Sequence, residues 1–138
     1  MQIAEINVGG KMLAFKASGM TQITYDSLFR GRNFINDMIS LNDIRSDIDA
    51  AGDDMTKVNI STDDLRVFAN VCYTMRYQAL TSPEKRAFRL KYPTTYDWLD
   101  YLNTFDIYTI LPQVMDLWHL DSIRTSKLEE KKAKPVES

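Results

Sequence analysis

Apolar and polar side chains alternate at the start of the chain, over residues 2–17. Ile6 and Val8 have polar neighbours, and after Gly9-Gly10 the alternation resumes and reaches Phe15. A period of two residues is typical of a strand with one buried face, and paired glycines can supply the positive φ angles of a two-residue turn. The pattern predicts a β-hairpin, which should pack on helices or pair with another chain because an isolated hairpin is marginally stable in water.

Beyond the hairpin the apolar residues recur at helical spacing. A short helix is expected after Thr21, interpreted as its N-cap, and Gly31 should end it. A second helix is expected from about Asn33. Residues 42–59 are polar and acidic with Gly52 as a breaker, which predicts a loop that could contain a helical turn. The apolar positions assigned to the two helices are Ile23, Leu28 and Phe29, then Phe34, Ile35, Met38, Ile39 and Leu41.

The clearest helical pattern extends from about Thr62 to Leu80. Ser61 or Thr62 is the expected N-cap, and the aspartates that follow favour the positive end of the helix dipole. Thr81-Ser82-Pro83 should stop this helix, and the basic residues 84–93 after it are interpreted as a solvated helix face or a linker. One apolar stripe is expected, formed by Leu65, Phe68, Ala69, Cys72, Met75 and Ala79.

Two further helices are expected before the C-terminus. The first holds Trp98, and the second follows Asp106 and carries Trp118 on its apolar side. Pro112 falls inside the second, so that helix should either begin late, near Leu111, or be kinked.

Together these elements predict a mainly α (α+β) fold in a chain of 138 residues, a length that fits one domain. Residues 1–122 should form the helical domain with its N-terminal hairpin. Residues 123–138 are charged and lack a core-forming pattern, which predicts a flexible, disordered C-terminal tail.

Composition narrows the class of protein. The net charge of −2 provides no global basic field for nucleic acid. Met1-Gln2-Ile3 does not begin a signal peptide, and the apolar stretch between Asp106 and Asp116 is too short to span a membrane. A single cysteine, Cys72, excludes an intrachain disulfide and agrees with a reducing compartment. We therefore expect a cytosolic protein that binds neither nucleic acid nor membrane.

Candidate chemistry is sparse. His119 is the only histidine and is interpreted as a surface or capping group, while Cys72 lies on an apolar stripe and should be a buried structural residue. The acidic segment from Asp47 matches a calcium loop at its third and sixth positions, but its fifth residue is Ala51, which has no side-chain oxygen, and its twelfth is Val58 rather than the closing glutamate. The sequence thus predicts no catalytic set, no cofactor and no metal site.

An aromatic segment over residues 96–118 holds both tryptophans, each beside a leucine and just behind an aspartate. Large aromatic side chains dominate cores and binding hot spots alike, so these residues could be core or interface. The candidate protein-binding residues are Trp98, Leu99, Leu102, Leu111 and Trp118.

Two blocks of sequence resemble the tail assembly chaperones of long-tailed bacteriophages. The first runs from Phe15 through Tyr25 and Phe29-Arg30-Gly31-Arg32-Asn33 to Asp37-Met38, where the family has a Phe-Gly-Arg-Asp-like turn. Here Arg30 separates the phenylalanine from the glycine, and Asn33 replaces the aspartate. The second block runs from Trp98-Leu99 through Phe105-Asp106-Ile107 to Leu117-Trp118. The combination spans about residues 10 to 120.

The resemblance implies a small, mostly helical, non-enzymatic protein. Such chaperones are made in the cytoplasm of the bacterial host and are absent from the mature virion. They are thought to coat the tape measure protein, keep it soluble and help recruit tail tube subunits, with self-association that could be spiral. One alternative is a non-enzymatic helical interaction module or DNA-binding regulator from a prophage or other mobile element, and the basic run Lys85–Lys91 motivates it. Another alternative is a small metal-dependent enzyme.

Overall fold

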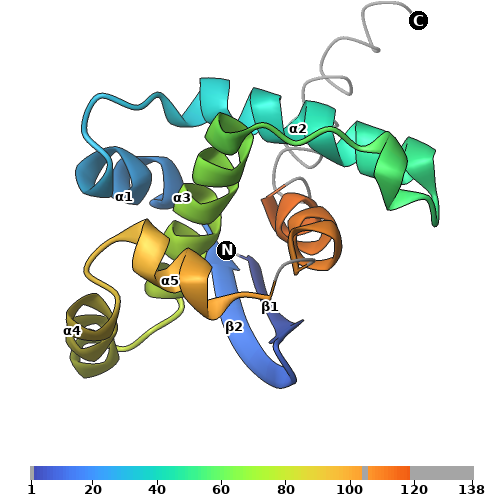
Figure 1. The fold of residues 1–138 in the computed structure, drawn as a ribbon. Coiled ribbons are helices and arrows are strands. Elements are labelled where there is room, and N and C mark those ends of the chain that lie inside the picture. The colour runs from blue at the N-terminus through green and yellow to red at the C-terminus, as the bar shows by residue number, and fades with distance from the viewer. Residues whose placement is uncertain (1, 104–105, 119–138) are drawn as a thin grey trace, which may run out of the picture.

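The computed structural model describes residues 2–103 and 106–118 and confirms a mainly helical fold with an N-terminal antiparallel hairpin (Figure 1). Strands β1 (Gln2–Val8) and β2 (Lys11–Ala17) pair so that Ile6 lies opposite Leu13. Gly9 and Gly10 join them with φ angles of 60° and 89°. These are the angles of a type I′ turn, which glycine adopts without steric cost, so the predicted turn is confirmed.

The hairpin packs on helix α3 (Thr62–Gln78) within the same chain. Its inner face buries Ile6, Val8 and Phe15 completely or almost so. Arg76 of α3 donates a hydrogen bond of 3.0 Å to the carbonyl of Ala14. Packing on a helix, one of the two expected arrangements for the hairpin, is therefore present.

Helix α3 lies at the centre of the fold, in contact with β2 and with all four of the other labelled α-helices (Figure 1). A capping box begins it: Ser61 accepts from the Asp64 amide, and Asp64 accepts from the Ser61 amide. The buried surface of α3 is wider than the single apolar stripe predicted from the sequence, because polar residues such as Asn70 and Thr74 are buried as well. The Thr74 hydroxyl is satisfied by the Asn70 carbonyl at 2.8 Å.

Helices α1 (Thr21–Leu28) and α2 (Phe34–Ala51) differ from the sequence expectation in detail. Thr21 is not the N-cap, which is Met20; Thr21 is buried, and its hydroxyl accepts the Ser18 amide at 2.9 Å. Ile23, assigned to the apolar face, is exposed. Ile35 and Ile39 are exposed as well, since the buried face of α2 follows Phe34, Met38 and Leu41.

The loop predicted over residues 42–59 is wrong for residues 42–51, which are helical, and confirmed for residues 52–59, which hold only a short 3₁₀ turn. Helix α2 continues to Ala51 because Ile44 and Ile48 extend its buried face, while the nearby aspartates, Asp43, Asp47 and Asp49, are exposed. A 3₁₀ turn, η1 (Met55–Lys57), follows. Ile44 and Ile48 lie four residues apart, which is helical spacing, but the many aspartates around them made the segment resemble a loop.

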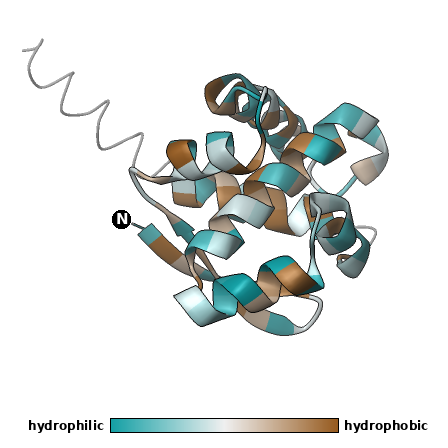
Figure 2. Ribbon diagram, turned by 90° about the vertical axis from the view of Figure 1, so that its left-hand side faces the viewer, coloured by the Kyte–Doolittle hydropathy of each residue, from teal (hydrophilic) through white to brown (hydrophobic). Residues whose placement is uncertain are grey.

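Thr81 is the N-cap of a further helix, α4 (Ser82–Lys91), in addition to following the end of α3. It caps α4 with a capping box to Glu84, and Thr94 caps α5 (Thr95–Tyr101) with one to Asp97. The basic segment is thus a helix, not a linker. Figure 2 shows hydrophobic and hydrophilic bands alternating along the helices, as expected of amphipathic helices around a shared core.

The last described segment, residues 106–118, is helical throughout and passes through Pro112, so the late start near Leu111 is wrong. It lies against α2, where the Trp118 ring meets Phe34 at 4.9 Å and Arg45 pairs with Asp116. No helix among the described residues is long and apolar enough to cross a membrane. The tail expected over residues 123–138 lies outside the described residues.

Candidate functional site

Trp98 of α5 is a core residue. Its side chain is 1% exposed and lies among the rings of Phe15, Tyr73 and Phe88 at centroid distances of 6.2–6.4 Å. These rings come from the hairpin, from α3 and from α4. Trp98 therefore joins three elements and presents no surface to a partner.

The five candidate binding residues do not form one exposed surface. Leu111 is fully buried like Trp98, whereas Leu99, Leu102 and Trp118 are partly buried. The expected single surface is absent because residues 96–118 alternate between positions that face α3 or α2 and positions at the edge of the core. Only the three partly buried residues remain available for contact without opening the fold.

The two sequence blocks meet inside the molecule. Phe15 of the first block contacts Trp98 of the second, and Trp118 of the second packs edge-on against Phe34, which lies between Asn33 and Asp37 of the first. Residues some 80 positions apart therefore share one core. Sequence reasoning identified both blocks but not their contact, since no local signal reports which aromatic rings will pair.

A buried polar cluster lies in the first block. Tyr25 of α1 donates a hydrogen bond to Asp37 of α2, and Arg32 donates two to the same carboxylate at 3.1 and 2.8 Å. Burial, followed by the bond to Asp37, raises the pKa of Tyr25 above its ordinary value. The hydrogen bonds that Arg32 itself donates to Asp37 are the main reason that the pKa of Arg32 is raised. A neutral phenol and a fixed ion pair here serve to join α1 and α2.

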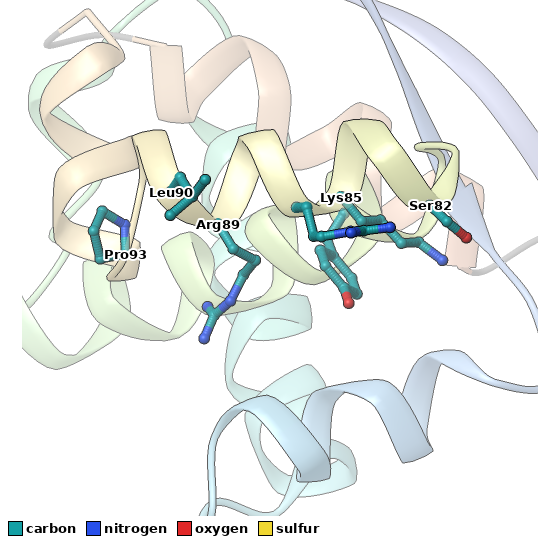
Figure 3. Close-up of a pocket in the computed structure, with 7 residues that line it drawn as sticks. Ser82, Lys85, Arg89, Leu90 and Pro93 are labelled. Atoms are coloured by element: carbon teal, nitrogen blue, oxygen red, sulfur yellow. The ribbon is translucent and has the colours of Figure 1, made fainter.

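An open groove lies along α4 (Figure 3). Lys85, Arg86 and Arg89 line it together with Tyr77 of α3. Sequence reasoning found the basic run, but only the fold shows that three of its cations share one concave surface. Ser82, Leu90 and Pro93 complete the lining.

The other chemical candidates are structural. Cys72 is completely buried, and burial raises the pKa of its thiol well above the ordinary value, which confirms the expected buried cysteine. The acidic segment that resembled a calcium loop is helical to Ala51, so it does not have the loop conformation of such a site. Within residues 2–103 and 106–118, no three His, Cys, Asp or Glu side chains gather as metal ligands would. His119 lies outside the described residues.

Comparison of the chain with protein-family models, curated proteins and solved structures gave no match. The resemblance to tail assembly chaperones therefore rests on the two sequence blocks.

Proposed function

We propose that this protein is a bacteriophage tail assembly chaperone, which binds the tape measure protein, keeps it soluble and helps recruit tail tube subunits. The observation that carries the proposal is the order and spacing of the two blocks. Their contacts through Phe15 with Trp98 and Phe34 with Trp118 support treating them as parts of one folded unit. The mainly helical fold is also the kind that the resemblance implies.

The physical requirements for binding a tape measure protein agree with the exposed apolar residues on α2. A tape measure is a very long helix whose apolar faces must not aggregate before the tube encloses it. A suitable binder makes repeated, moderate contacts that tube subunits can displace, and many copies along one filament gain by avidity. Ile35 and Ile39 lie one turn apart and exposed on α2, where they could meet an apolar helix face.

Self-association belongs to the same proposal. Copies that contact each other head-to-tail without closing would form a spiral coat around the filament. The protein would act in the cytoplasm of the bacterial host and be absent from the mature virion. In this account Leu99, Leu102 and Trp118 contact the partner, and Trp98 and Leu111 contribute through the fold.

Binding to an immobilised tape measure protein from the same genome tests the proposal. The purified chain should bind it, and Leu102→Ala together with Ile39→Ala should weaken that binding. Ile3→Ala, which truncates an exposed isoleucine on the outer face of the hairpin, is the matched control and should bind like the wild type. A wild-type chain that fails to bind contradicts the proposal.

The second candidate is a DNA-binding regulator from a mobile element. The cations of α4 are the observation that favours it. Salt-sensitive binding to duplex DNA would support this function, and absence of binding at low salt would exclude it.

A further inference from the structure

The groove on α4 is built on one helical face. Ser82, Lys85, Arg86, Arg89 and Leu90 follow at spacings of three, four, seven and eight residues from the first, so they share a side of the helix. Figure 3 shows Lys85 and Arg89 extending from α4 on the same side of the helix. The groove has a volume of about 570 Å³, within the range of sites that hold small ligands or a few side chains.

Its cations have no acidic partner in the described part of the chain. The ion pairs found there all use Arg32, Arg45 or Arg66. Glu84, the one acidic residue of α4, turns back to the helix start, where it accepts the Thr81 amide at 2.9 Å. That hydrogen bond lowers the pKa of Glu84, because it stabilises the ionised carboxylate at the cap.

Aromatic residues hold two of the cations in place. Arg89 donates a hydrogen bond of 2.9 Å to the Tyr73 hydroxyl, which itself donates to the Tyr92 carbonyl. The Arg89 guanidinium also lies 5.7 Å from the centre of the Tyr73 ring, and the Lys85 ammonium lies 5.2 Å from that of Tyr77. Such cation–π contacts reduce the freedom that an exposed cation would lose on binding a ligand.

We propose that this groove binds an acidic segment of a partner protein that also carries an apolar side chain. Carboxylates of the segment would pair with Lys85, Arg86 and Arg89, which have no acidic partner among the described residues. The apolar side chain would lie against Leu90, which is 82% exposed, and Pro93 at the end of the groove.

A peptide fits these observations better than duplex DNA does. Three cations in one compact groove match two or three carboxylates, whereas a duplex presents a long row of phosphates and binds through many of them. The net charge of −2 also opposes binding to a polyanion. The site is separate from Leu99, Leu102 and Trp118, so this inference goes beyond the proposed function and does not rest on it.

Fluorescence anisotropy with the full chain tests the site. The probe is a fluorescein-labelled nonapeptide that carries three acidic residues and one leucine, with its amide counterpart (Gln for Glu, Asn for Asp) as the uncharged comparison. The acidic probe should bind, more weakly as salt rises, and the amide probe should not. Lys85→Gln with Arg86→Gln should weaken binding about tenfold or more, which corresponds to ~1.4 kcal/mol.

The matched control is Lys11→Gln with Lys57→Gln, which removes the same charge from exposed residues on the hairpin and η1. It should bind the acidic probe nearly as the wild type does. Arg89 is left intact because it supports Tyr73, and circular dichroism confirms that each double variant is folded. Equal weakening in both double variants, or no binding by the wild type, overturns the proposal. Tighter binding of a labelled DNA duplex that the α4 variant abolishes also overturns it, in favour of nucleic acid.

Discussion

Tyr25 and Asp37 connect α1 to α2 through a buried hydrogen bond from the phenol to the carboxylate. Arg32, in the turn between the helices, completes the cluster by donating two hydrogen bonds to Asp37. The residues that carry the first block of the family resemblance therefore have a structural role in this chain. They join α1 and the turn after it to the first turn of α2, where Phe34 packs against Trp118.

Removing the shared acceptor should destabilise the fold. Asp37→Ala leaves the Tyr25 hydroxyl and the partly buried Arg32 without their partner, and we expect a loss of about 2–4 kcal/mol in the free energy of unfolding. Urea denaturation followed by circular dichroism measures this loss. Asp43→Ala, on the exposed side of the same helix, is the control and should change stability by less than about 0.5 kcal/mol.

Stability should fall at alkaline pH. Burial, with the bond to Asp37, raises the pKa of Tyr25 in the folded state, so the unfolded state releases this proton first. The stabilisation is complete below the ordinary tyrosine pKa of about 10 and is lost as pH rises above it towards the folded value. Burial of Cys72 acts in the same direction. Urea midpoints between neutral pH and pH 11 should decline less steeply in Tyr25→Phe than in the wild type; identical slopes would refute the assignment.

Trp98→Ala should act on folding. The ring is buried among three others, and its removal should cost about 3–5 kcal/mol. We expect a large drop in thermal midpoint by circular dichroism. Leu90→Ala removes an exposed side chain and should leave the midpoint nearly unchanged. A Trp98→Ala protein with wild-type stability and defective binding would instead show that the ring is an interface residue.

Cys72 should be unreactive in the native protein. It lies completely buried within α3, and its thiol is held in the protonated form by burial. A thiol reagent such as DTNB should react at the rate of unfolding in buffer and at once in concentrated urea. Rapid reaction of the native chain would mean that α3 opens locally.

The hairpin and most helices followed from the sequence because their signals are local. Gly9-Gly10 and the Ser61 cap fix a turn and a helix start within a few positions. The second half of α2 was missed because only Ile44 and Ile48 mark its buried face, whereas the surrounding aspartates resemble those of a loop. Tertiary packing outweighed composition there.

The candidate site was harder to predict than the fold. Trp98 and Trp118 each follow an aspartate closely and adjoin a leucine, yet one is in the core and the other at its edge, because their surroundings come from distant elements. The groove on α4 needed Tyr73 and Tyr77 of another helix to position its cations. Such sites depend on contacts between residues that are distant in sequence, and no local pattern predicts those contacts.

The most direct measurement of the proposed function is the solubility of the tape measure protein encoded in the same genome, expressed with and without this chain. Its soluble fraction should rise sharply on co-expression with the wild type, and the two proteins should co-purify. Asp43→Ala should preserve this effect, because it alters neither the fold nor the proposed contacts. A tape measure that remains insoluble and unbound beside an abundant, folded chain would contradict the proposal that this protein is a tail assembly chaperone.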